Sequence, residues 1–312
     1  MFKHLLYCPF TGLGLYQGFR GNAWLRNRIQ IFKQFVLPNL QAQDTDFTLW
    51  ISWRPEEKKN PIVKEFQEFL KTTGLSVVHT FHGVCFWDDK YPPEQAYDRL
   101  ISALHGSSQD LVNATAGAEW VYMTIQPSDD CYAIGTFRSI QRVFEESDVT
   151  AFGFTRGYVM DYRTLRVKEW NPKTNPPFYT IKFPRAVFLN PREHVEYTAL
   201  KKDSGPYPKG TPLPSHEYVG DCLNYGTVED RGFLVGTHSA NISTVFDHPY
   251  TGKETGGMLK FFGLQDVGPL TLRQSLRSKL FDRLPYKAKR KLRYWAEKNL
   301  FPFNALYNFL RA

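Results

Sequence analysis

The length, composition and charge of the chain exclude several classes of protein. It has 312 residues, of which 42% are hydrophobic and 22% are charged, which is typical of a globular protein and excludes a disordered or fibrous one. The formal net charge is +8, but eleven basic and two acidic residues lie within 271–312, so the rest of the chain is nearly neutral. No window of the sequence approaches the ~20 apolar residues that span a bilayer.

The cysteines and the N-terminus indicate the compartment. Cys8, Cys85, Cys131 and Cys222 lie far apart and form no CxxC pair, which argues against a zinc ribbon or a disulfide framework. The first ten residues lack the long apolar stretch and the cleavage site of a signal peptide. We therefore expect a cytoplasmic protein, at most peripheral on the inner face of a membrane.

Apolar runs typical of strands alternate with helical patterns over the first 150 residues. The expected strands are 3–10, 47–53, 75–81 and 119–125, and the expected helices are 22–40, 60–74, 92–105 and 132–146, the last with Ile134, Phe137, Ile140 and Phe144 facing inward. This alternation predicts an α/β fold, with a mainly parallel central sheet and helices on both faces.

The pattern changes after residue 150. A hairpin is expected from 151–162 and 166–170, further strands at 179–183 and 231–237, and a helix at 190–202. The stretch 204–214 is rich in proline and glycine, which predicts a loop that can move over a site.

Asp129 and Asp130 follow the expected strand 119–125, at the end where parallel sheets bind their ligands. Two neighbouring buried carboxylates are costly unless a cation lies beside them. Mg²⁺ or Mn²⁺ accepts such ligands and completes its shell with water and phosphates, and a nucleotide-sugar supplies a diphosphate. The pair predicts a metal site, with Asp130 as a ligand and Asp129 as a second ligand or as the acceptor of a hydrogen bond from the donor ribose or sugar.

The same residues have a plainer interpretation. Ser128, Asp129 and Asp130 precede the expected helix 132–146, and serine and aspartate are favoured helix N-caps. The sequence leaves both interpretations open.

Five further residues are candidates for the site. His238 follows the last expected strand, and it is either a third metal ligand, a phosphate contact or an ordinary histidine with a hydrogen-bond partner. Asp221 and Glu217 are candidate catalytic bases for an acceptor hydroxyl, against the alternative of surface acids without a role. Arg20 and Arg26 flank a glycine-rich loop and are candidate donor-phosphate ligands, against the alternative of exposed arginines.

Several short segments support a family resemblance that spans roughly residues 1–245. They are Arg20, Arg28-Ile29-Gln30-Ile31-Phe32, Leu37-Pro38-Asn39-Leu40, Gln43, Phe47-Thr48-Leu49-Trp50-Ile51, Pro176-Pro177-Phe178-Tyr179 and His238-Ser239-Ala240-Asn241. Together they resemble the bacterial rhamnosyltransferase family, which belongs with the GT-A glycosyltransferases. Ser128-Asp129-Asp130 stands where the DXD-like metal motif of that family would fall, although it is not a literal Asp-X-Asp.

The resemblance implies a GT-A-like (Rossmann-like) domain over 1–265. Its donor-binding half would cover about 1–150 and its acceptor half about 151–265. It also implies a nucleotide-sugar donor, with rhamnose as the sugar.

A basic helical tail is expected over 266–312. Leu272, Leu276, Leu280 and Leu284 recur every fourth residue among lysines and arginines, as on one face of a helix. Such a helix can lie on an anionic membrane surface, or its leucines can dock on the rest of the protein. Nucleic acid is a less favoured partner, because no binding module accompanies the tail.

Three functions follow from these observations. The first is a metal-dependent glycosyltransferase of the hexosyltransferase type, which moves a sugar from a nucleotide-sugar to a glycan or lipid-linked acceptor. The second is a metal-dependent nucleotidyl- or phosphoryl-transfer enzyme, for which the sequence lacks a phosphate-binding glycine loop. The third is a non-catalytic protein that binds a membrane or nucleic acid through its tail.

Overall fold

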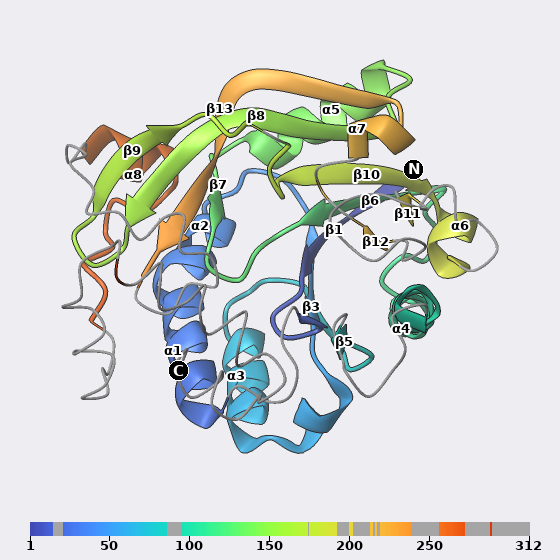
Figure 1. The fold of residues 1–312 in the computed structure, drawn as a ribbon, viewed down its shortest axis with the longest axis horizontal. Coiled ribbons are helices and arrows are strands. Elements are labelled where there is room, and N and C mark those ends of the chain that lie inside the picture. Colours follow the sequence, from blue (N-terminus) through green and yellow to red (C-terminus); the bar gives the residue numbers. More distant parts are fainter. Residues whose placement is uncertain are drawn as a thin grey trace.

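A nine-stranded mixed sheet runs through the described part of the chain, with helices on both of its faces (Figure 1). The computed structural model describes residues 1–14, 21–85, 95–173, 175–191, 200–201, 213–214, 216, 219–238, 256–271 and 288. The predicted α/β class is confirmed.

The main sheet has the strand order β4-β3-β1-β6-β10-β8-β13-β7, and β9 pairs with β8. The strands are β1 (Phe2–Cys8), β3 (Thr48–Ser52), β4 (Val77–Thr80), β6 (Trp120–Ile125), β7 (Cys131–Tyr132), β8 (Ala151–Asp161), β9 (Arg166–Trp170), β10 (Tyr179–Pro184) and β13 (Tyr225–Thr237). Two short pairs lie outside it, β2 (Leu13–Gly14) with β5 (Val84–Cys85) and β11 (Leu200–Lys201) with β12 (Leu213–Pro214).

The helical elements lie mostly between these strands. They are α1 (Asn22–Ile31), the π-turn η1 (Phe32–Val36), α2 (Leu37–Gln41), the 3₁₀ turn η2 (Pro55–Lys59), α3 (Pro61–Lys71), α4 (Ala96–Asp110), α5 (Thr136–Glu146), α6 (Arg185–Leu189), α7 (Val219–Cys222) and α8 (Gly256–Phe261). None of the helices in the described residues has the length and apolar character that crossing a membrane requires.

The strand directions bring distant segments to one edge of the sheet. β4, β3, β1 and β6 are parallel to one another. β10 is antiparallel to both β6 and β8, so β8 runs in the same direction as β6, and β13 is parallel to β8. The carboxyl ends of β1, β3, β4, β6 and β13 therefore lie along one edge, which we call the carboxyl edge.

The two faces of the sheet are buried by different helices. Successive side chains of a strand point to opposite faces, and in β1 Leu6 and Cys8 join one apolar cluster whereas Leu5 and Tyr7 join another. The first cluster includes residues of α1, α3 and α5, and the second includes residues of α6 and α7 together with Leu111, which follows α4. Strands buried on both faces account for the continuous apolar runs in the sequence.

Most of the helices expected from the first half of the sequence are confirmed. The expected helix 22–40 is the run α1–η1–α2, which contains a π-turn directly before Pro38, a residue that has no N–H to donate within a helix. In α3 the Asn60 side chain accepts a hydrogen bond from the Ile62 N–H at 2.9 Å, as expected of an N-cap.

Two expected helices differ from the structure. The expected helix 132–146 begins only at Thr136, because Cys131 and Tyr132 pair with β13; Ile134 is exposed, whereas Phe137, Ile140 and Phe144 are buried. The expected helix 190–202 is contradicted at both ends, where α6 stops at Leu189 and residues 200–201 form β11. Residues 192–199 lie outside the described residues.

The chain up to residue 271 packs on the sheet domain. Leu264 and Leu270 are buried in a third apolar cluster, and the carbonyls of Gly268 and Thr271 accept hydrogen bonds from Gln34 of η1 and Gln30 of α1, respectively. The packed body therefore extends past the predicted boundary at 265. Of the expected tail helix, the leucines 272, 276, 280 and 284 lie outside the described residues, as does most of the expected loop 204–214.

Asn39 connects three elements in the core beside the carboxyl edge. Its Nδ2 donates to the carbonyls of Tyr132 (2.6 Å) and Phe262 (2.8 Å), and its Oδ1 accepts from the Tyr132 N–H (3.1 Å). Asn39→Ala should lower the free energy of unfolding by more than about 2 kcal/mol, because it leaves these buried groups unpaired. Urea unfolding measures the change. Gln41→Ala, which loses one exposed hydrogen bond to Thr73, is the control, and an equal effect of the two variants would contradict the expectation.

Candidate functional site

The loop 126–130, which follows β6 at the carboxyl edge, holds Asp129 and Asp130 against the end of β13. Tyr132 donates its hydroxyl to the Ile125 carbonyl at 2.7 Å, and Tyr162 donates to the Asp129 carbonyl at 2.8 Å. Inside the loop, Gln126 Nε2 donates to the Asp130 carbonyl at 2.9 Å. Hydrogen bonds from Tyr132 and Tyr162 and a hydrogen bond within the loop therefore fix its position on the sheet domain.

Asp129 is paired with two basic side chains. Nη1 of Arg28 contacts Oδ2 of Asp129, and Nε2 of His238 lies 3.1 Å from the same oxygen. Arg28 comes from α1 and His238 directly follows β13, so the site combines three segments that meet because of the strand directions. The Arg28 side chain is 3% exposed, the His238 side chain 0% and the Asp129 side chain 17%.

Asp130 is directed toward the end of β13. Its Oδ1 accepts a hydrogen bond from the Gly236 N–H at 2.8 Å. A Cβ atom on Gly236 would lie 2.3 Å from the Asp129 carbonyl oxygen and 2.3 Å from the Tyr162 ring. Only glycine allows the strand to approach the loop this closely.

The structure excludes the helix-cap interpretation of the acidic pair. α5 begins at Thr136 with Gly135 as its N-cap residue, at φ 81°, and β7 lies between the pair and this helix. Asp129 and Asp130 are thus part of a loop at the carboxyl edge, as the functional interpretation requires.

Burial and neighbouring charges shift the pKa values of the three titratable groups. Burial alone would raise the pKa of the Asp129 carboxyl, but the Arg28 guanidinium and the hydrogen bond from His238 outweigh burial and keep this pKa below its usual value. Burial, followed by the charge of Asp129, raises the pKa of the Asp130 carboxyl. Burial lowers the pKa of His238. Asp129 is therefore the ionised member of the pair, and His238 donates to it from a neutral ring.

The three predicted metal ligands lie at the same end of β13, but one oxygen of each carboxylate already has a partner in the protein. Oδ2 of Asp129 faces Arg28 and His238, and Oδ1 of Asp130 accepts from Gly236. Among the residues that the structure describes, no group of three or more His, Cys, Asp or Glu side chains is arranged to hold a metal ion. The arrangement does not fit a divalent ion bound by Asp129, Asp130 and His238 together. Dependence on Mn²⁺ or Mg²⁺ stays a prediction.

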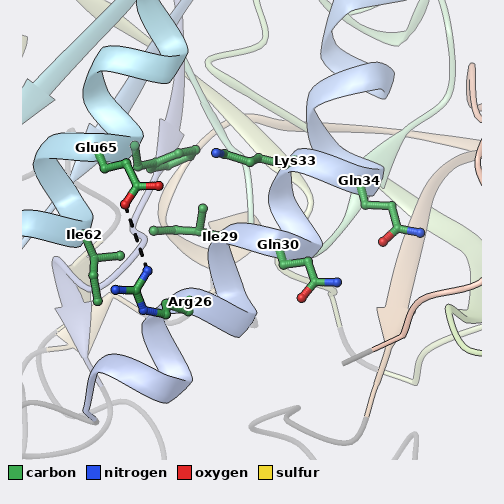
Figure 2. Close-up of a pocket in the computed structure, with 8 residues that line it drawn as sticks. Arg26, Ile29, Gln30, Lys33, Gln34, Ile62 and Glu65 are labelled. Carbon is green, nitrogen blue, oxygen red and sulfur yellow. Dashed lines mark ion pairs between the residues drawn. The ribbon is translucent and has the colours of Figure 1, made fainter. Parts of the chain in front are cut away.

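Arg26 lies away from this cluster. Two residues along a helix correspond to a rotation of about 200°, so Arg26 points to the other side of α1 from Arg28. Figure 2 shows it at a surface pocket of about 380 Å³ between α1 and α3, where Nη1 of Arg26 is 4.0 Å from Oε2 of Glu65. The structure therefore does not bring Arg26 and Asp129 into one site.

The candidate base Asp221 stands at the opposite edge of the sheet. It belongs to α7, directly before β13, whereas His238 follows the other end of this 13-residue strand. At about 3.3 Å per residue, the strand separates the two positions by tens of ångströms (Figure 1). Its position does not support a role beside Asp129. Glu217 and Arg20 lie outside the described residues.

A second pocket of about 630 Å³ lies at the carboxyl edge, beyond β3 and β4. Pro55 and His82, which follow these strands, form one side of it, and the first half of α4 forms the other. Its remaining lining residues are Val84, Gln95, Asp98, Arg99, Ser102 and Ala103.

Comparison with known proteins gives no family assignment. No protein-family profile and no curated protein matches the chain. Among solved structures, residues 1–349 of S. aureus TarS in complex with UDP-GlcNAc align with 99% of this chain and 90% of that chain, at 12% identity and a TM-score of 0.42. The same fragment in complex with UDP aligns with 100% of this chain and 90% of that chain, at 12% identity and a TM-score of 0.41. TM-scores this low carry no conclusion about family or function.

Arg28 is the residue of this site to which the sequence interpretation gave no role. The signal is its position on the buried face of α1, four residues after Trp24, three after Leu25 and four before Phe32, all buried apolar residues. An arginine on such a face needs a buried acid as its partner. The sequence cannot show which acid this is.

Proposed function

We propose that the chain is a glycosyltransferase that binds a nucleotide-sugar along the carboxyl edge of its sheet. The observation that supports this most directly is the ionised Asp129, fixed by Arg28 and His238 and partly exposed, at the edge where parallel sheets bind ligands. The segments that resemble the rhamnosyltransferase family support the same reaction, with rhamnose as the sugar and a glycan or lipid-linked acceptor.

The pocket beyond β3 and β4 gives the nucleoside a place. Neighbouring strands are about 4.8 Å apart, so this pocket lies about 10–15 Å along the edge from the end of β6. A nucleoside in the pocket, with its diphosphate directed along the edge, would bring the sugar close to Asp129. The sugar hydroxyls can then donate to the carboxylate, which accepts hydrogen bonds only.

A thermal-shift screen tests the proposed function. UDP, GDP, CDP, dTDP and their sugar conjugates are added to the purified protein, with EDTA or with Mn²⁺. One nucleotide should raise the melting temperature, because a ligand at 100 times its dissociation constant stabilises the folded state by about 2.7 kcal/mol. No shift with any nucleotide in either buffer would contradict the proposal.

A variant that fills the pocket beyond β3 and β4 tests whether the nucleotide binds there. Ala103→Phe places a ring in the pocket beyond β3 and β4 and should abolish the nucleotide-induced shift. Ala116→Phe is the control, because Ala116 is exposed in the turn before β6, at the opposite edge of the sheet. Release of nucleoside diphosphate together with a glycosylated acceptor distinguishes sugar transfer from nucleotidyl or phosphoryl transfer.

A further inference from the structure

The cation beside the partly buried Asp129 is an arginine of the protein itself. Nη1 of Arg28 contacts Oδ2 of Asp129, and the arginine side chain is almost fully buried. Its guanidinium carbon lies 5.4 Å from the centroid of the Trp24 ring, one turn earlier on α1. The aromatic ring and the carboxylate together fix the guanidinium between α1 and the loop 126–130.

A divalent ion at Oδ2 of Asp129 would compete with this arginine. A carboxylate oxygen offers two lone pairs, and Arg28 and His238 both lie against this one. The guanidinium is positively charged, so it would also repel an incoming cation. The positive charge that a buried acidic pair requires is already present.

Asp129 is the part of this cluster that a ligand can reach. Its side chain is 17% exposed, compared with 3% for Arg28 and 0% for His238. An ionised carboxylate accepts hydrogen bonds and donates none. In a nucleotide-sugar the matching groups are the hydroxyls of the ribose and the sugar, and the phosphates do not match.

We propose that Arg28 takes the place of a divalent metal at this site. Arg28 and His238 act as positioning residues that orient the Asp129 side chain, and Asp129 accepts a hydrogen bond from a hydroxyl of the donor. Donor binding then requires no metal ion. This inference rests on the proposed function, because it specifies how the same site binds the nucleotide-sugar.

The first experiment compares wild-type binding with and without metal. Isothermal titration calorimetry of the full chain with UDP, GDP, CDP, dTDP and their sugar conjugates is run in EDTA and in Mn²⁺. The nucleotide-sugar that binds should show dissociation constants within about threefold of each other in the two buffers. Binding that needs Mn²⁺ would overturn the inference and leave the proposed function standing, whereas no binding in either buffer would overturn both.

The second experiment changes the arginine. Arg28→Met removes the charge, and Arg28→Lys keeps the charge but loses the planar fork. In EDTA the methionine variant should bind the donor about 10–100-fold more weakly, as is typical when an orienting partner is lost, and the lysine variant should recover part of this loss. Electron paramagnetic resonance should detect Mn²⁺ bound to Arg28→Met and none bound to the wild type, a gain that a purely structural role would not produce.

Arg231→Lys is the matched control. Arg231 also pairs with a carboxylate, with 2.7 Å between its Nη2 and Oε2 of Glu169, and its guanidinium carbon lies 5.4 Å from the Tyr158 ring centroid. The Arg231→Lys variant should bind the donor with the affinity of the wild type. Circular dichroism verifies that each variant folds. If Arg28→Met does not fold, the inference is tested by the donor affinity of Arg28→Lys and by the wild-type affinities in EDTA and in Mn²⁺. A folded Arg28→Met that binds the donor in EDTA as the wild type does would overturn the inference.

Discussion

Asp129→Ala should lower the free energy of unfolding by about 3–5 kcal/mol and abolish donor binding. The loss of stability follows because the variant leaves the Arg28 guanidinium buried without its carboxylate, and an uncompensated buried charge has an effect of this size. The loss of binding follows because Asp129 is the most exposed member of the cluster, at 17%. Urea unfolding and calorimetry with the nucleotide-sugar measure the two effects.

The double variant Arg28→Met with Asp129→Ala separates the two effects. Replacing both partners of a buried ion pair by apolar residues is often neutral, so stability should return while donor binding stays absent. Asp44→Ala is the control for the loss of an acid, because the Asp44–Arg138 pair is largely exposed, and such pairs contribute about 0–1 kcal/mol. If Asp129→Ala destabilises the protein no more than Asp44→Ala does, the ion pair between Arg28 and Asp129 does not stabilise the fold as expected.

Gly236→Val should disrupt the site through its backbone. The Cβ atom alone would lie 2.3 Å from the carbonyl oxygen of Asp129, and this loop backbone is also fixed by the Tyr162 hydroxyl. Overpacking costs about 1–3 kcal/mol, and losing the hydrogen bond from the Gly236 N–H to Asp130 adds about 1–3 kcal/mol. We expect a total loss of about 2–6 kcal/mol, measured by urea unfolding, and no donor binding.

Gly257→Ala is the control for the glycine change. A Cβ atom there meets nothing within 4 Å, and the residue lies in α8. Alanine in a helix should stabilise the protein by about 0.5–1 kcal/mol relative to glycine. Equal stability of the two glycine variants would show that the close approach of β13 to the loop is not required.

Periodicity predicted the elements whose apolar pattern is local, and it failed where a distant segment decided the conformation. The helix α5 is predicted correctly from Thr136 onward, because Phe137, Ile140 and Phe144 lie on one buried face. The expected helix began at Tyr132, yet Tyr132 is a strand residue. It pairs with β13 about a hundred residues later, and its N–H donates to Asn39 at 3.1 Å.

The region 190–202 shows the same limit. The helix expected at 190–202 includes residues 200–201, which instead pair with 213–214. A strand pair of two residues leaves no periodic signal in the sequence. Pairing between segments that are more than ten residues apart therefore decides a conformation that local propensity assigns differently.

The amino-acid sequence was enough to place an acidic pair at the carboxyl end of a buried strand and to require a cation beside it. A run of apolar residues and the residues that follow it are local features of the sequence. Burying a carboxylate without a partner costs free energy in any fold, so the need for a nearby cation follows from the sequence as well. The identity of the cation depended on tertiary structure. Arg28 and Asp129 come from α1 and from the loop after β6, and His238 is 109 residues beyond Asp129. They meet because strand order and direction bring the ends of β1, β6 and β13 to the same edge.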